Sequence, residues 1–302
     1  MTSSQNNRPT CLLSFDVEEM FQIEAARPYI SPRLWDESEW RVGQAVEWIL
    51  EELAKHDAHA TFFLLGWVAE RNRAVVRRIV EAGHEAACHG HAHERLHELS
   101  PESFRADLRR AKEIIEDITG QPVVGYRAPT FSLTRQTQWA VDVLIEEGFK
   151  YDSSVQPVRG HPQYGEPTAP VAPFQFTHSS GAPSLTELPP LTWKIGSLRL
   201  PVAGGGYFRA LPLSFMRAGI RQAGRQDRPP VLYFHPWEFD VNQPRLPLPA
   251  LAYWRTYIGL NRTRNRLTRL LKKINGIPLN HWLTQHDPIP ASTFTFPANR
   301  AA

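Results

Sequence analysis

The chain has 302 residues, a length that fits one large domain or two ordinary ones, and α/β barrels often use such a length as one unit. Its composition is that of an ordinary globular protein, with 42% hydrophobic and 22% charged residues, and a net charge of +3 gives no reason to expect a nucleic-acid partner. Two cysteines, Cys11 and Cys88, exclude a disulfide framework. A polar start and the lack of a long apolar run predict a cytoplasmic protein without a signal peptide or transmembrane segment.

Short apolar runs, predicted as strands, alternate with segments of helical spacing in the first half of the chain. Residues 11–15 form the first apolar run, and two acids follow it. Further strands are expected at residues 58–65, 84–88 and 123–126. Helices are expected at residues 43–55, 68–82, 100–119 and 134–147, and several stop at a glycine. Alternating strands and helices predict an α/β fold with a parallel sheet or barrel.

The second half is less regular. Eight prolines between residues 156 and 190 predict a long irregular insertion. A strand is expected at 231–234, with a tight loop at 204–208 before it. We therefore divide the chain into a barrel at 9–240 and a C-terminal extension at 241–302 that packs on it.

The extension is basic. Between Asp240 and Asp287 the sequence has no acidic residue, and several arginines and lysines lie along a helix expected at 255–274. Such a face could approach a membrane that carries anionic lipids, so peripheral membrane association is one interpretation. A simply solvated face is the interpretation we prefer.

Three histidines, His89, His91 and His93, follow the third expected strand. Neutral imidazole is the commonest metal ligand among side chains, and three within five residues are hard to explain by packing. We expect His89 and His93 to be the ligand pair, although strand alternation would instead pair His89 with His91. Two imidazoles and one carboxylate would leave positions for water and substrate. A surface loop without a metal is the alternative.

Four other tips of expected strands also carry polar groups. Asp16 and Glu18 are two residues apart and share a face of an extended backbone, so one can ligate a metal while the other acts as a base. Arg127 would pair with Asp16 and hold it ionised, and His235 is suited to protonate a leaving group. Asp152 lies at a further tip. A helix cap or a surface ion pair could explain any one of these residues alone. Neither explains well why five strand tips that meet at one rim all carry polar groups.

These motifs, in this order, resemble those of the NodB-homology polysaccharide deacetylases, carbohydrate esterase family four. The segments that carry the resemblance are Ser14–Asp16, His89–His93, Arg127–Pro129, Tyr151–Ser154 and Leu232–His235. A closer resemblance, to deacetylases of exopolysaccharide loci that accompany the PEP-CTERM/exosortase system, spans nearly the whole chain. It is carried by Asp16–Gln22, Tyr126–Pro129, Gly204–Phe208 and His235–Glu238.

Two positions depart from the family pattern. Val17 stands where the family has the second of two adjacent aspartates, so the choice of Glu18 rather than Asp16 as metal ligand rests on strand geometry. Val155 and Gln156 stand where the fourth motif usually has a tryptophan, which puts one wall of the substrate groove in doubt.

The resemblance implies a distorted (β/α)7 TIM-like barrel of the NodB type and a hydrolase that removes N-acetyl groups from amino sugars. The substrate would be an exopolysaccharide, an oligosaccharide or a lipid-linked precursor, and the cofactor a divalent metal, expected to be Zn²⁺. Other interpretations stay open: a metal amidohydrolase acting on a small cyclic amide, or a non-catalytic carbohydrate-binding homologue.

The expected site residues fall into three groups. The metal ligands are Glu18, His89 and His93. The catalytic residues are Asp16 as base, His235 as acid and Arg127 as the partner of Asp16. The substrate-binding residues are Pro129, Thr130, Phe131, Asp152 and Trp237.

Overall fold

A computed structural model describes residues 8–159, 164–181, 183–286 and 292–297, and its larger sheet supplies the framework. The strands of this sheet are β1 (Thr10–Val17), β2 (Thr61–Leu64), β3 (Glu85–Cys88), β4 (Gly125–Tyr126), β5 (Tyr151–Asp152), β6 (Phe174–Thr177), β7 (Pro183–Glu187), β10 (Val231–Phe234), β11 (Asn275–Ile277) and β12 (Thr293–Phe294). A separate antiparallel hairpin contains β8 (Thr192–Ile195) and β9 (Leu198–Pro201).

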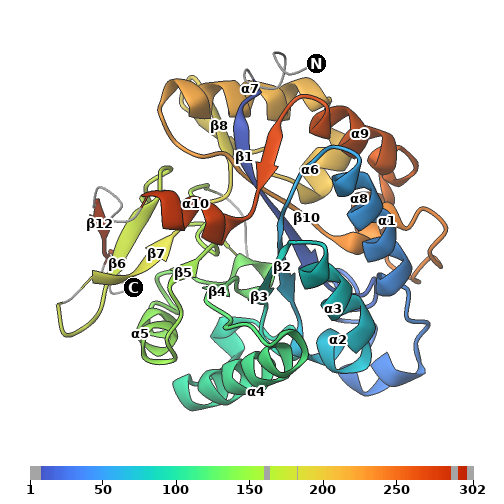
Figure 1. Ribbon diagram of the computed structural model, residues 1–302, viewed down its shortest axis with the longest axis horizontal. Helices are drawn as coiled ribbons and strands as arrows, with labels where there is room; N and C mark the ends of the chain where they lie inside the picture. Colours follow the sequence, from blue (N-terminus) through green and yellow to red (C-terminus); the bar gives the residue numbers. More distant parts are fainter. Residues whose placement is uncertain (1–7, 160–163, 182, 287–291, 298–302) are drawn as a thin grey trace.

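Helices surround these strands, as Figure 1 shows. They are α1 (Val42–Ala54), α2 (Gly66–Arg71), α3 (Arg73–Glu81), α4 (Pro101–Thr119), α5 (Trp139–Glu146), α6 (Gly205–Ala210), α7 (Leu213–Arg225), α8 (Ala250–Tyr257), α9 (Thr263–Leu271) and α10 (Leu279–His286). The helix α4 illustrates how sequence sets its ends: Ser100 caps its start through the N–H of Ser103, and Gly120 ends it in the left-handed conformation.

The strand order is β10-β1-β2-β3-β4-β5-β7-β6-β12, with β11 paired to β1. The run from β10 to β7 contains seven strands, all paired in parallel. A parallel bridge between Pro190 and Val231 brings the chain that follows β7 back to β10. The predicted α/β fold, a distorted barrel of seven parallel strands, is therefore confirmed.

The main hydrophobic core, in which strands pack against the surrounding helices, is rich in aromatic rings. The ring of Phe15, from β1, stacks on Phe62 from β2 with 5.1 Å between ring centroids, and contacts Phe234 from β10 at 5.8 Å. All three side chains are fully buried. Strands covered on both faces need such continuous apolar runs, and this is why residues 11–15 show no alternation.

Residues 156–190, expected to be an irregular insertion, hold two strands of the main sheet. β7 is the seventh parallel strand, and β6 pairs with it in antiparallel fashion. The prolines do not prevent this, because Pro173 precedes β6, Pro183 is the first residue of β7, and Pro189 and Pro190 follow it. The prolines therefore mark strand ends, and the expectation of an irregular segment was wrong for this part.

Two other expected elements also differ. The glycine-rich stretch at 204–208 starts α6 instead of forming only a loop. The basic helix expected at 255–274 is divided into α8 and α9, because Gly259 adopts the left-handed conformation with φ of 70°. The extension then returns to the sheet through β11, which pairs in parallel with β1. The division at residue 240 stays a prediction.

In the described part of the chain, no helix combines the length and the apolar character needed to cross a membrane.

Candidate active site

The side chains of interest gather at the carboxyl ends of neighbouring parallel strands. Asp16 lies near the end of β1 and Glu18 just after it, His89 follows β3, Arg127 follows β4, and His235 follows β10. Since β10, β1, β2, β3 and β4 are consecutive in the sheet, their carboxyl ends lie along one rim of the barrel.

Glu18, His89 and His93 form a compact cluster. Each can offer one ligand atom, and these atoms lie within 4.8 Å of one another. The Nε2 atom of His93 is 2.8 Å from a carboxylate oxygen of Glu18. All three side chains are buried, and His93 reaches the cluster from a left-handed backbone conformation with φ of 54°. Two imidazoles and a carboxylate suit a divalent transition metal, so the donor set fits such an ion.

Contacts around the cluster orient its donors. The Nδ1 atom of His89 lies 2.7 Å from the carbonyl oxygen of Arg127, which accepts a hydrogen bond and leaves Nε2 free to bind a metal. Burial lowers the pKa of His89 to about 3, which keeps the ring neutral, as ligation requires. The indole of Trp237 donates from Nε1 to Glu18 at 3.1 Å. Burial favours the neutral form of Glu18, but the imidazoles of His93, His235 and His89 outweigh it and lower its pKa.

The other histidine of the motif points away from this cluster. His91 is buried, and its Nδ1 atom lies where a Cβ on Gly66 would clash. The loop is fixed instead by Asp107 from α4, which accepts hydrogen bonds from the backbone N–H groups of His91 at 2.8 Å and Ala92 at 3.3 Å. The histidines that meet Glu18 are therefore His89 and His93, which are four residues apart, and not His89 and His91.

Asp16 and Arg127 form a buried ion pair beside the cluster. Nη1 of Arg127 donates to Oδ1 of Asp16 at 2.7 Å and to Oγ of Ser14 at 2.7 Å. Its Nε and Nη2 groups donate to the carbonyl and hydroxyl oxygens of Ser153 at 3.0 and 2.8 Å. The guanidinium lies 4.2 Å from the ring centroid of Phe63 and has no exposed area. Arg127 therefore holds the carboxylate of Asp16 in one position.

His235 faces both acids from the end of β10, the strand next to β1. Its Nε2 atom lies 3.9 Å from Asp16 and 3.8 Å from Glu18, while Nδ1 lies 3.2 Å from Oε2 of Glu238. Burial favours a neutral ring, but the hydrogen bond to Glu238 and the charges of Glu18, Glu238 and Asp16 outweigh it and raise the pKa of His235 to about 9. The ring can therefore carry a proton on the nitrogen that faces the site.

Comparison with known proteins agrees with this geometry. Residues 35–146 match the family described as polysaccharide deacetylase. The predicted resemblance to the polysaccharide deacetylases therefore holds for this part of the chain. Residues 153–283 match a second family, described as a domain of unknown function, DUF3473. The family resemblance is thus confirmed, while the closer resemblance to exopolysaccharide-locus proteins stays a prediction.

Two relatives of the matched segment are named as peptidoglycan deacetylases. The chain is 33% identical over 107 residues to a peptidoglycan deacetylase of Helicobacter pylori, and 30% identical over 125 residues to a peptidoglycan-N-acetylglucosamine deacetylase of Bacillus cereus. These matches cover 35% and 37% of this chain, and 36% and 46% of the relatives' own lengths, so the chain spans less than half of either.

A solved structure from Mycobacterium smegmatis, provisionally described as a polysaccharide deacetylase, has the same fold. It has a TM-score of 0.66 and 20% identity, and the superposition covers 99% of this chain and 97% of that one. The shared fold thus extends beyond residue 146, into the part of the chain that matches the domain of unknown function.

Two of the residues expected to bind substrate, Asp152 and Trp237, are buried. Asp152 has no exposed area; it accepts hydrogen bonds from Ser154 and lies in a buried pair with Glu187. Trp237 is 7% exposed and uses its indole N–H to hold Glu18, with its ring stacked on His235 at 5.7 Å. In the structure these two side chains contact other groups of the site, and their contact with substrate stays a prediction.

The turn at residues 129–131 supplies one accessible group. Pro129 and Phe131 are buried and Thr130 is partly exposed, and the contact of all three with substrate stays a prediction. Thr130 and Phe131 both have positive φ, at 57° and 52°. A β-branched residue adopts this conformation only when its surroundings enforce it, and such strain concentrates at functional sites.

Sequence reasoning missed Glu238 and Arg209. Glu238 is fully buried, accepts from the backbone N–H of His235 at 2.9 Å and from Nε of Arg209 at 2.6 Å, and so orients the imidazole. For Glu238 the sequence did hold a signal, because an acid three residues after a histidine at the end of a strand can reach back to that histidine. The spacing of Arg209 from both residues gave no such signal.

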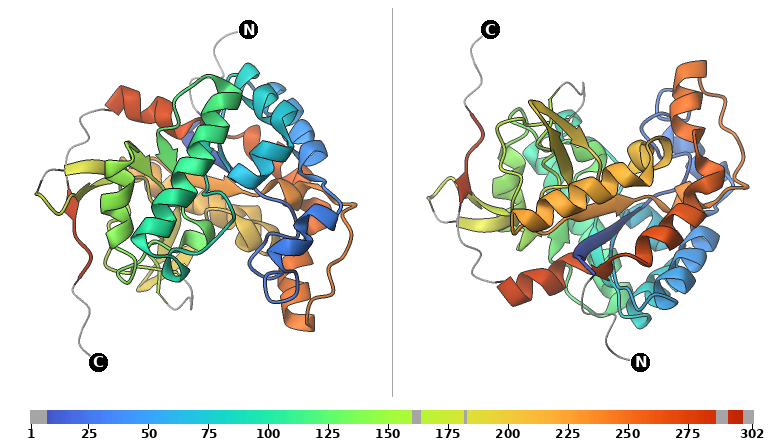
Figure 2. Two further views of the ribbon diagram at one scale, coloured as in Figure 1. Left: turned by 90° about the horizontal axis from the view of Figure 1, so that it is seen from below. Right: turned by 90° about the horizontal axis from the view of Figure 1, so that it is seen from above.

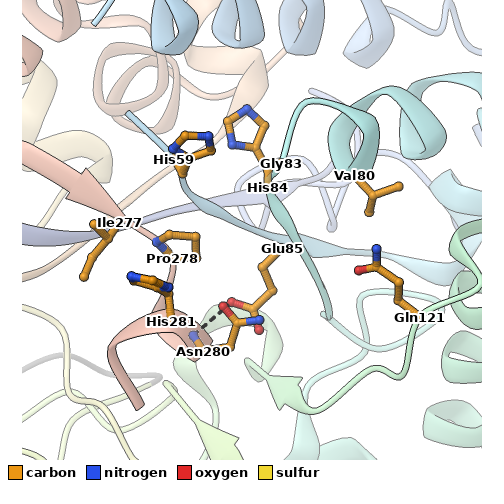
Figure 3. Close-up of a pocket in the computed structure, with 10 residues that line it drawn as sticks. All are labelled: His59, Val80, Gly83, His84, Glu85, Gln121, Ile277, Pro278, Asn280 and His281. Atoms are coloured by element: carbon orange, nitrogen blue, oxygen red, sulfur yellow. Dashed lines mark hydrogen bonds between the residues drawn. The ribbon is translucent and has the colours of Figure 1, made fainter. Parts of the chain in front are cut away.

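A cavity of about 340 Å³ lies at the other end of the barrel. Figure 3 shows Glu85, His59, His84 and Asn280 around it, next to the start of β3 and of α10. Because the potential metal ligands lie at the carboxyl ends of the strands, this cavity is separate from the candidate active site.

Proposed function

We propose that this protein is a metal-dependent deacetylase that hydrolyses N-acetyl groups of amino sugars in a polysaccharide or its precursor. One observation carries the proposal: the cluster of Glu18, His89 and His93 lies next to an ion-paired acid, Asp16, and a histidine, His235, that faces both acids. The names of the relatives and the deacetylase domain support an N-acetylglucosamine-type substrate.

Glu18, His89 and His93 would hold the ion, and zinc is the metal that we propose for this donor set. When bound, such an ion acidifies a water molecule and polarises the acetyl carbonyl. The three protein ligands leave open positions, as a catalytic site needs. Asp16 lies outside this ligand set and keeps its second oxygen for other contacts.

Asp16 would take the first proton. Arg127 occupies Oδ1, so Oδ2 is the oxygen that accepts the proton from the attacking water. The water oxygen forms a bond to the acetyl carbon and gives a tetrahedral intermediate. Because the guanidinium of Arg127 has no exposed area and donates to four oxygen atoms, one of them Oδ1 of Asp16, the carboxylate of Asp16 stays in place before each cycle.

His235 would supply the second proton. Its Nδ1 side is held by Glu238, so Nε2 carries the proton toward the site. As the tetrahedral intermediate collapses, the carbon–nitrogen bond breaks and Nε2 gives its proton to the departing amine. The products are acetate and a free amino sugar, and the proton held by Asp16 returns to solvent or to His235.

Metal content and acetate release together test this proposal. Purified protein should retain about one metal ion per chain and release acetate from N-acetylglucosamine oligomers, and a chelator should abolish turnover until metal is restored. Protein without retained metal, or metal-loaded protein that releases no acetate from any N-acetylated glycan, would count against it. Release from a small cyclic amide alone would favour a different amidohydrolase.

A further inference from the structure

The helix α8 is the most exposed apolar element among the described residues. Leu251 is 60% exposed and Trp254 is 57% exposed, and Tyr253 on the same helix is 40% exposed. Leu251 and Trp254 are three residues apart, so they share one face of the helix. Arg255 is exposed beside them. Side chains of this size rarely gather on a free surface without an interaction partner.

The helix is held rigidly even though its outer face is exposed. Nη1 of Arg209 donates to the backbone carbonyl oxygens of Arg255, Thr256 and Ile258 at its end. On the inner side, the hydroxyl of Tyr257 accepts a hydrogen bond from the N–H of Leu246 at 2.8 Å. Docking of the outer face would therefore need no rearrangement of the helix.

The helix projects from the end of the barrel that carries the candidate site. In both views of Figure 2, α8 and the segment that follows β1 extend from one side of the molecule, while α10 lies on the opposite side. The contacts agree, since Arg209, which holds the end of α8, also binds Glu238, the partner of His235.

The charge around α8 has one sign. From Val241 to His286 the sequence has eight arginines and lysines and no aspartate or glutamate. The exposed cations of this stretch are Arg245, Arg255, Arg262, Arg269, Lys272 and Lys273. A Trp-containing apolar face next to arginines matches the chemistry of an anionic bilayer, where indole lies among the headgroups and cations attract the lipid phosphates.

We propose that α8 docks this protein on the surface of an anionic phospholipid bilayer, with Leu251 and Trp254 inserted at the headgroup level. The exposed cations supply the electrostatic attraction, and the carboxyl ends of the barrel strands face the bilayer. The element proposed to insert is thus α8, and not the basic helix expected at residues 255–274. The proposal does not depend on deacetylase activity, since binding is measured without substrate.

Vesicle flotation tests the proposal on the full chain. The probes are vesicles of phosphatidylcholine alone and of phosphatidylcholine with phosphatidylglycerol. The double variant Leu251→Gln and Trp254→Gln removes the apolar face of α8. The matched control is the double variant Ile195→Gln and Leu198→Gln, because these two apolar side chains are also exposed, at 43% and 58%, but lie on the β8–β9 hairpin. Unchanged far-UV circular dichroism and an unchanged urea unfolding midpoint show that both variants are folded.

The wild type and the control should float with the anionic vesicles, and the α8 variant should bind them at least about tenfold more weakly. Salt should weaken wild-type binding. Failure of the wild type to float, equal flotation with neutral vesicles, or equal loss in both variants would overturn the proposal. A further outcome would overturn it: the wild type binds no vesicles and is a dimer, and the α8 variant is a monomer. The apolar face of α8 would then join two copies of this chain.

Discussion

Arg127 and Asp16 are 111 residues apart in the sequence and form a buried pair at 2.7 Å, with the guanidinium fully enclosed. Removal of one partner from such a pair leaves an uncompensated charge, whereas the intact pair mainly fixes geometry. Arg127 also binds Ser14 and Ser153, so it joins the ends of β1, β4 and β5. The pair thus couples the proposed base to the framework of the barrel.

We expect Arg127→Lys to lower kcat by about a hundredfold with little change in metal content. Lysine keeps the charge but cannot bond Asp16, Ser14 and Ser153 together from one planar group. The free energy of unfolding should also fall, by about 1 kcal/mol for each hydrogen bond that lysine cannot make. Steady-state kinetics, metal analysis and urea unfolding measure the three quantities.

The matched control for that experiment is Arg73→Lys. Arg73 pairs with Asp117 at 2.6 Å, but both side chains are exposed, and surface pairs contribute less than about 1 kcal/mol. The control should therefore behave like the wild type. Equal kcat in the Arg127 variant and the wild type would contradict the positioning role.

Asp16→Asn and Glu18→Gln should separate the two roles of the acids. Asp16→Asn should keep its metal and lose at least about a hundredfold in kcat, because the proton acceptor is gone while the ligand set is intact. Glu18→Gln should lose metal affinity, together with activity. Metal titration followed by kinetics at saturating metal distinguishes them, and loss of metal in Asp16→Asn would instead make Asp16 a ligand.

The sequence alone predicted those parts of the site that depend on the spacing of residues along one segment. A strand tip places Asp16 and Glu18, and a spacing of four places His89 and His93. Parallel pairing then brings distant tips to one rim, so the pairing of Arg127 with Asp16 could be foreseen.

The remaining features depend on tertiary contacts that spacing does not encode. Asp152 occupies a strand tip like the other residues, yet β7 brings Glu187 against it and buries both. Because β7 was hidden in a proline-rich stretch, that neighbour could not be foreseen. In the same way, nothing local shows that the indole of Trp237 turns inward toward Glu18.

Glu238→Gln should lower kcat about tenfold or more with little effect on KM or metal content. Glutamine keeps the size of the side chain but removes the charge that favours protonated His235. The comparison variant Glu238→Asp keeps the charge and should recover part of the activity if it still reaches the ring. A parallel rise in KM and loss of metal would indicate collapse of the site instead of misorientation of His235.

The buried pair of Asp152 and Glu187 should make stability depend on pH. Burial raises the pKa of both carboxyls, and for Glu187 the charge of Asp152 raises it further, so the folded protein holds a proton that the unfolded chain has released. A carboxyl with a raised pKa contributes stability below its unfolded value, and this contribution is lost as the pH rises toward its folded value.

Glu187→Gln should therefore flatten the alkaline side of the stability profile. The neutral amide replaces the protonated carboxyl, so the difference in unfolding free energy between variant and wild type should shift in favour of the variant by up to about 1.4 kcal/mol per pH unit. Urea unfolding from about pH 5 to pH 9 measures it. The exposed Glu81→Gln serves as control and should give a constant difference, and a constant difference for Glu187→Gln as well would show that the pair carries no extra proton.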